Sequence, residues 1–134
     1  MISFFVEGIP APQGSKNGYI QNGRVVMVEA SKKVKPWRQA VSLATTEAMR
    51  NRSTITEPVE ITLVFYLPRP KTVTRLLPSV KPDLDKLIRS TFDGLTTGGL
   101  YVDDALVIAV TATKAYATDK SGCYVHVANE VSDV

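Results

Sequence analysis

The sequence predicts an α+β domain in which two main helices pack on a mixed, mainly antiparallel sheet. Runs rich in β-branched and aromatic residues recur along the chain, as is typical of strands. Two other segments repeat apolar residues at helical spacing. The chain has 134 residues, of which 44% are hydrophobic, so we expect a single domain spanning 1–134 with a packed core.

Five segments are predicted to form the strands. They are Ile2–Glu7, a hairpin over Tyr19–Val28, Val59–Leu67, Leu106–Tyr116 and Cys123–Ala128. Asn22-Gly23 is a favoured two-residue hairpin turn. The first segment is expected to be buried on both faces, and Val59–Leu67 is expected to be a central strand.

The first helix is expected from Lys32 to about Arg52. Ser31 is a candidate N-cap, and Pro36 is best tolerated in the first turn. Trp37 is interpreted as a core anchor rather than a platform on which bases stack.

The second helix is expected to begin after Pro82, because a proline disfavours helical backbone at the residue before it. Asp83 is a good N-cap, and either Gly94 or the Gly98-Gly99 pair supplies the stop. The apolar stripe consists of Leu84, Leu87, Ile88, Phe92 and Leu95.

Two acidic pairs surround this second helix, Asp83 with Asp85 and Asp103 with Asp104. Asp83 alone could be no more than a cap at the positive end of the helix dipole. Asp85 is harder to explain this way, because so many carboxylates repel one another unless a cation is present. Oxygen-only acidic clusters suit Mg²⁺ or Mn²⁺.

Positive charge lies next to these acids. The net charge is +3 and the sequence pI is about 9.1, which by itself does not indicate nucleic acid. The segment at about 68–82 holds four prolines and four basic residues, and we interpret it as a flexible basic loop that orders on DNA. The candidate DNA contacts are Lys16, Arg24, Lys32, Lys33, Arg69, Lys71, Arg75 and Lys81. Lys16 and Arg24, each taken singly, are better explained as solvated surface cations. For Lys32 and Lys33, a solubilising helix face and a DNA contact are equally favoured.

The single cysteine, Cys123, excludes an intramolecular disulfide framework and fits a reducing, cytoplasmic compartment. It is expected to be an apolar strand residue rather than a catalytic thiol, and metal binding by His126 is not expected. No secretory leader is visible, and no apolar run is long enough to cross a membrane.

The ordered motifs resemble the RusA family of Holliday-junction resolvases. They run Lys81-Pro82-Asp83-Leu84-Asp85-Lys86-Leu87-Ile88-Arg89, then Phe92-Asp93-Gly94-Leu95, then Val102-Asp103-Asp104, with Gly8-Ile9-Pro10-Ala11-Pro12-Gln13-Gly14-Ser15-Lys16 near the start. The resemblance implies a RusA-like fold and a homodimeric, bacterial or phage-encoded endonuclease. Such an enzyme uses Mg²⁺, for which Mn²⁺ can substitute, and no small-molecule cofactor. It makes paired symmetric nicks in four-way DNA junctions during recombination and repair.

The resemblance also implies site roles. Asp83, Asp85 and Asp104 would bind metal, and Arg89 and Lys86 would stabilise the transition state. The family usually has asparagine where this chain has Lys86 and lysine where it has Arg89. Arginine keeps the positive charge but does not release a proton, so Arg89 suffices if the role is charge stabilisation. Proton donation would instead be left to Lys86.

Two alternatives remain open from the sequence. One is a different Mg²⁺-dependent nuclease that acts on flaps or single-stranded DNA, and the other is a DNA-binding relative without activity. The exchange of lysine for Arg89 keeps the second alternative open, whereas three retained carboxylates argue against it.

Overall fold

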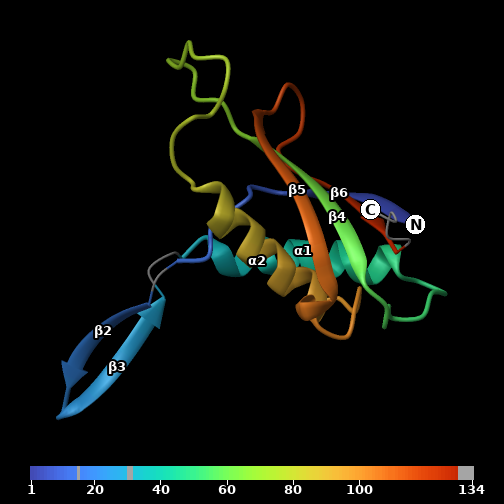
Figure 1. Cartoon of the computed structure of the whole chain (residues 1–134). Coiled ribbons are helices and arrows are strands. Elements are labelled where there is room, and N and C mark those ends of the chain that lie inside the picture. The colour runs from blue at the N-terminus through green and yellow to red at the C-terminus, as the bar shows by residue number, and fades with distance from the viewer. Residues whose placement is uncertain (15, 30–31, 130–134) are drawn as a thin grey trace.

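A computed structural model describes residues 1–14, 16–29 and 32–129 (Figure 1). Its main sheet contains β1 (Ile2–Glu7), β4 (Val59–Leu67), β5 (Val107–Tyr116) and β6 (Gly122–Ala128) in the order β1-β6-β4-β5. The β1–β6 and β6–β4 pairs are antiparallel, and the β4–β5 pair is parallel. The predicted α+β class with a mixed, mainly antiparallel sheet is therefore confirmed.

The predicted central strand is β4, which lies between β6 and β5. Its residues alternate between buried and half-buried, which means that one face of the sheet is packed against the helices. The expectation that the first strand is buried on both faces is wrong. β1 is an edge strand in which Ile2 and Val6 are buried, whereas Phe5 is 41% exposed.

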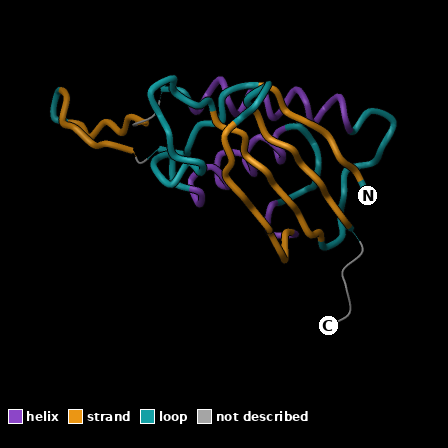
Figure 2. The backbone as a smooth tube through the Cα atoms, turned by 90° about the horizontal axis from the view of Figure 1, so that it is seen from above, coloured by secondary structure: helices purple, strands orange, loops and turns teal. Residues whose placement is uncertain are grey.

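The predicted hairpin is confirmed. It consists of β2 (Lys16–Gln21) and β3 (Arg24–Glu29), which pair only with each other among the described strands. Asn22 and Gly23 have φ values of 52° and 74°, as a tight turn between twisted strands requires. The hairpin extends away from the main sheet (Figures 1 and 2).

The first helix, α1, is shorter than expected and spans Val34–Ala48, with Lys33 at its N-cap. The candidate cap Ser31 lies outside the described residues, and Pro36 falls in the first turn as predicted. Trp37 is 2% exposed and its Nε1 donates a hydrogen bond to Thr91 Oγ1 at 3.2 Å. Its predicted role as a core anchor is confirmed.

The second helix, α2, spans Leu84–Thr97 with Gly98 as its C-cap, so Gly94 does not end it. Gly94 instead permits α1 to approach closely, because a Cβ at this position would lie 2.6 Å from Val41 Cβ. A Cβ at Gly98 would lie equally close to Thr45 Cβ. The two glycines therefore set how closely α1 and α2 pack.

No helix within the described residues is long and apolar enough to span a membrane.

Candidate active site

Asp83 and Asp85 lie together at the N-terminal end of α2. Asp83 is the N-cap residue, with extended backbone (φ −69°, ψ 138°), but its side chain makes no capping hydrogen bond. It lies 3.8 Å from Lys86 Nζ instead. Asp85 lies exposed in the first turn. Both carboxylates can therefore accept a ligand, and a pure capping role for Asp83 does not match the geometry.

The start of the chain helps to hold this end of α2. The backbone N–H of Gln13 donates to the carbonyl of Lys86 at 3.0 Å, and Ser90 Oγ donates to the carbonyl of Ala11 at 2.6 Å. Ser90 is fully buried, so this bond is shielded from water. The proline-containing loop after β1 thus packs on the helix that carries the acidic pair.

The two candidate cations lie within about one turn of these acids. Lys86 is half-buried and pairs with Asp83. Arg89 is exposed, and no hydrogen bond or ion pair engages its side chain in the part of the chain that the structure describes. Its guanidinium is available for an incoming phosphate.

The second acidic pair follows α2 and the Gly98-Gly99 turn. Asp103 is the N-cap of the short 3-10 helix η1 (Asp104–Leu106), and its Oδ1 accepts a hydrogen bond from the backbone N–H of Ala105 at 2.9 Å. Asp104 is the first residue of η1 and has no such capping role. The carboxylate of Asp103 is therefore engaged in capping η1, which makes Asp104 the better candidate of the pair for binding a cation.

The surroundings of Asp104 are acidic. Partial desolvation, hydrogen bonding with the Asp103 side chain, and the negative charges of Asp103 and Asp93 together raise its pKa above the ordinary value. A nearby cation would relieve this repulsion.

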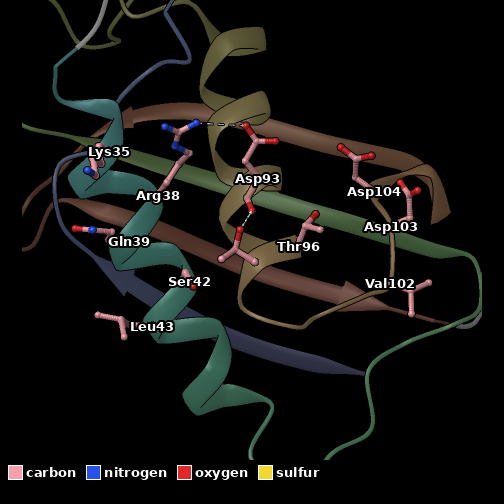
Figure 3. Close-up of a pocket in the computed structure, with 11 residues that line it drawn as sticks. Lys35, Arg38, Gln39, Ser42, Leu43, Asp93, Thr96, Val102, Asp103 and Asp104 are labelled. Carbon is pink, nitrogen blue, oxygen red and sulfur yellow. Dashed lines mark hydrogen bonds and ion pairs between the residues drawn. The ribbon is translucent and has the colours of Figure 1, made fainter. Parts of the chain in front are cut away.

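Asp104 lines a groove of about 990 Å³ between α1 and the C-terminal half of α2 (Figure 3). Lys35 and Arg38 project from α1 into this groove, and Asp103 and Asp104 lie at its other end. Between them, Asp93 Oδ2 lies 3.8 Å from Arg38 Nη1. The groove therefore has a cationic end and an acidic end.

The structure does not bring the three predicted metal ligands together in one chain. Asp83 and Asp85 lie at the start of α2, whereas Asp104 lies beyond its end and near Asp93. A helix of 14 residues is about 21 Å long. Accordingly, no group of three potential metal ligands occurs among the described residues. The oxygen ligands suit Mg²⁺, but their arrangement in a single chain does not.

The basic loop between β4 and α2 is held by its own side chains. Arg69 donates to the carbonyls of Val73 (3.2 Å) and Arg75 (2.8 Å). Its guanidinium carbon also lies 5.4 Å from the ring centroid of Tyr116, whose hydroxyl accepts a hydrogen bond from Arg75 at 3.0 Å. These two predicted DNA contacts thus have structural roles. The predicted flexibility of the loop stays a prediction.

The other predicted DNA contacts differ in what the structure describes. Lys71 and Lys81 are exposed in the loop, as are Arg24 at the hairpin turn and Lys32 and Lys33 before α1. The side chain of Lys16 lies outside what is described. The exposed cations are spread over three segments and remain available to a polyanion.

Sequence reasoning missed three participants. Lys114 on β5 donates to the carbonyls of Val80 (2.8 Å) and Pro82 (3.0 Å), which fastens the end of the loop beside Asp83. Asp93 and Arg38 form the ion pair in the groove. A long-range contact such as that of Lys114 leaves no local pattern, but Asp93 lies within a motif that the sequence does display.

The expectation that Cys123 is an apolar residue of a late strand is confirmed. Cys123 is fully buried, and burial raises the pKa of its thiol. His126 lies on the half-buried face of β6, where its Nδ1 lies 2.6 Å from Ser3 Oγ. Tyr124 and His126 alternate with the buried residues Cys123, Val125 and Val127.

Comparison with known proteins gives two matches. The family model described as endodeoxyribonuclease RusA matches residues 10–128. An uncharacterized protein of Bacillus subtilis (strain 168), YqaN, is 32% identical over 130 residues, which cover 88% of this chain and 89% of the relative.

Proposed function

Because the chain belongs to the RusA family of endodeoxyribonucleases, we propose that it is a Mg²⁺-dependent endonuclease that resolves four-way DNA junctions. Membership of this family supports the nuclease part of the proposal, because the family is described as endodeoxyribonucleases. The exposed, cap-free Asp83 and Asp85, with Lys86 and Arg89 beside them, are the observation in this chain that best supports phosphodiester hydrolysis.

The position of the carboxylates adds a condition to this proposal. We call Asp83 and Asp85 the helix carboxylates and Asp104 the turn carboxylate. They lie at opposite ends of α2, so a complete oxygen site needs two chains. A two-fold axis reverses one helix relative to the other and would bring the helix carboxylates of each chain towards the turn carboxylate of its partner.

Such a homodimer suits a four-way junction, because two identical sites related by a two-fold axis can nick two strands symmetrically. Asp83, Asp85 and the partner subunit's Asp104 would hold the metal, with Mn²⁺ as a substitute for Mg²⁺. When bound, the metal would lower the pKa of a water ligand and stabilise negative charge on the phosphate. Arg89 and Lys86 would bind and orient the phosphate and balance the charge that develops on it.

The test is cleavage of a synthetic four-way junction beside a linear duplex of the same sequence. Reactions are run with Mg²⁺, with EDTA, and with the variants Asp85→Asn and Glu57→Gln. Glu57 is an exposed carboxylate outside the candidate site and serves as the matched control. We expect paired nicks in the junction alone, dependent on Mg²⁺ and on Asp85 but not on Glu57.

Two outcomes separate the alternatives. Cleavage of flaps or single strands in preference to junctions would replace the resolvase by another structure-specific nuclease. Junction binding without nicks in Mg²⁺ or Mn²⁺ would leave a DNA-binding relative without activity. Asp85→Asn should keep or strengthen binding, because it removes negative charge from a phosphate site.

A further inference from the structure

The basic loop between β4 and α2 carries an exposed pair of leucines. Leu76 is 83% exposed and Leu77 is 66% exposed. Val80 is 47% exposed in the same segment, whereas Pro78 is buried. In Figure 1 this loop, drawn in yellow-green, rises above the sheet and the helices. The loop therefore presents adjacent aliphatic side chains to solvent on a segment that projects from the rest of the molecule.

Contacts on both sides of the leucine pair hold the loop to the protein. Before the pair, Arg69 donates to the carbonyls of Val73 and Arg75, and Arg75 donates to the Tyr116 hydroxyl. After the pair, Lys114 donates to the carbonyl of Val80 at 2.8 Å. The arrangement reverses that of an ordinary surface loop, because these charged side chains bond the protein while the leucines face water. Apolar area kept out of the core in this way gains free energy when a ligand covers it.

The charge of the loop indicates what kind of ligand fits. Residues 68–82 contain four basic residues and no acidic residue. Lys71 and Lys81 are exposed there. A polyanion such as DNA meets favourable charge along the whole segment. The leucines would then contact the apolar part of the same ligand, which in DNA is the stacked faces of the bases.

The position of the leucine pair ties this ligand to the candidate active site. Six positions separate Leu77 from Asp83 in the sequence. An extended chain of that length spans at most about 22 Å. One strand of DNA advances about 3.4 Å per nucleotide, so the bases that Leu77 can reach lie within about six nucleotides of a phosphate at Asp83. The bond from Lys114 to the carbonyl of Pro82 holds the connection between the two sites.

We propose that Leu76 and Leu77 form an apolar wedge that inserts against unstacked bases at the branch point of a DNA junction. This inference rests on the proposed function, because it takes branched DNA as the ligand. Aliphatic side chains can enter a base step, unstack it and kink the duplex. A branch point already interrupts the stack, so the wedge costs less free energy there than in a linear duplex. The leucine pair would therefore select branched DNA over linear DNA.

Two other ligands share part of this chemistry. An anionic lipid surface also attracts basic residues and leucines, but it gives no reason for the loop to lead directly into Asp83 and Asp85. An apolar pocket of another protein would cover the leucines, but it does not require a loop without acidic residues. Branched DNA accounts for the leucines, the charge and the position together.

The first test measures base stacking directly. A four-way junction carries 2-aminopurine at its branch point, where the fluorescence of this base rises when it unstacks. The Asp85→Asn protein leaves the junction uncut, and we expect its binding to raise the fluorescence several-fold at saturation. Leu76→Ser and Leu77→Ser, added together to this protein, should remove most of the rise. An equal rise with these serine changes would overturn the wedge.

Two controls separate apolar volume from other effects. Leu76→Met with Leu77→Met keeps a flexible apolar side chain at both positions and should retain the rise. Ile9→Ser removes an aliphatic side chain that is 61% exposed in the loop after β1, and it should change nothing. Because both leucines are exposed, the serine variant should keep its free energy of unfolding in urea. A methionine variant as defective as the serine variant would overturn the wedge.

The second test compares affinities for the junction and for a linear duplex of the same sequence, measured by fluorescence anisotropy. The serine variant should bind the junction about 10-fold less tightly and the duplex almost unchanged, because its cations are intact. Equal losses on both DNAs would overturn the selective role. Unchanged DNA affinities would also overturn it. Loss of binding to phosphatidylserine vesicles would then assign the leucines to a lipid surface, and a changed mass in sedimentation equilibrium would assign them to a protein contact.

These measurements separate the wedge from the nuclease. If the wild type nicks junctions and the serine variant nicks them with the same rate and preference, the wedge is overturned and the proposed function stands. If the leucines unstack the branch-point base but the wild type never nicks a junction, the wedge is supported and the proposed function is overturned. Absence of any junction binding would overturn both.

Discussion

Lys114 Nζ donates a hydrogen bond at 3.0 Å to the carbonyl oxygen of Pro82, the residue immediately before Asp83. A second bond, to the carbonyl of Val80 at 2.8 Å, fixes the same end of the loop. A side chain of the edge strand thus positions the residue that begins the acidic helix. The edge strand β5 and the start of the acidic helix are thereby linked directly.

Removal of this lysine should reduce catalysis more than folding stability. Lys114→Met keeps the aliphatic length and loses both hydrogen bonds, so Asp83 is free to shift. A displacement of about 1 Å can reduce the rate of a positioned reaction by about 100-fold. We expect a loss of about 10- to 100-fold in junction cleavage, measured under single-turnover conditions. Lys120→Met is the control, since among the described residues Lys120 forms only a surface pair with Glu7, and an equal effect there would contradict a specific role.

Mixed dimers should show whether the carboxylates act across two chains. Asp85→Asn and Asp104→Asn chains, each inactive alone, should regain activity when co-expressed with different tags and purified as heterodimers. One of the two sites then contains an intact set, so one strand should be nicked rather than two. Asp83→Asn mixed with Asp85→Asn is the control and should stay inactive, because both changes fall in the same half of the site. An inactive Asp85→Asn/Asp104→Asn dimer would mean that each chain uses its own carboxylates.

The acidic pair after α2 should divide by role. Asp103→Asn keeps a good capping side chain for the N–H of Ala105 and removes a negative charge beside Asp104. That removal should lower the raised pKa of Asp104 towards its ordinary value, because the Asp103 side chain is one of the causes that raise it. We expect Asp103→Asn to retain cleavage within a few fold and Asp104→Asn to fall to background in the same assay. Greater loss from Asp103→Asn would reverse the assignment.

The close contact of the two helices should not tolerate a methyl group. In Gly94→Ala the new Cβ would overlap Val41 Cβ, and the two backbones must separate. Overpacking of this kind costs about 1–3 kcal/mol, which urea denaturation would measure as a lower free energy of unfolding. Thr97→Ala, an exposed position on the same helix, should change it much less. A neutral Gly94→Ala would show that α1 and α2 can move apart freely.

The buried thiol provides a measure of folding. Burial raises the pKa of Cys123, so little thiolate exists at pH 8, and the side chain is shielded from reagents. We expect Cys123 to react with an aromatic disulfide only after urea unfolds the chain, with release of the thiolate product followed by absorbance. A Thr118→Cys variant should react at once at its second thiol, because Thr118 is exposed in the turn after β5. Immediate reaction of Cys123 in the native protein would contradict its burial.

Periodicity and turn chemistry predicted much of the fold correctly. The alternation along Val59–Leu67, the Asn22-Gly23 turn and the apolar stripe of α2 are local patterns, and each matches the structure. The errors have local causes too. The sequence left Gly94 and the Gly98-Gly99 pair as alternative helix stops, because a glycine weakens a helix. Gly98 is the C-cap, and Gly94 instead allows the close approach of Val41.

The site was predicted less completely. The carboxylates were identified from their spacing and from the resemblance. Their separation in space was not predicted, because it depends on where α2 ends and on the direction that the chain takes into β5. The role of Asp103 became clear only through its bond to Ala105. Arg69 and Arg75 look like DNA contacts in the sequence, and only their bonds within the loop and to Tyr116 give them structural roles.

The placement of acids at both ends of one helix has a kinetic consequence for the proposed nuclease, which concerns how its cleavage rate depends on protein concentration. If no single chain holds a full set, the rate at low protein concentration should rise with the square of concentration and reach first order once pairing saturates. Dilution would then silence the nuclease without any inhibitor. A newly synthesised chain would be harmless to DNA until it meets a second one.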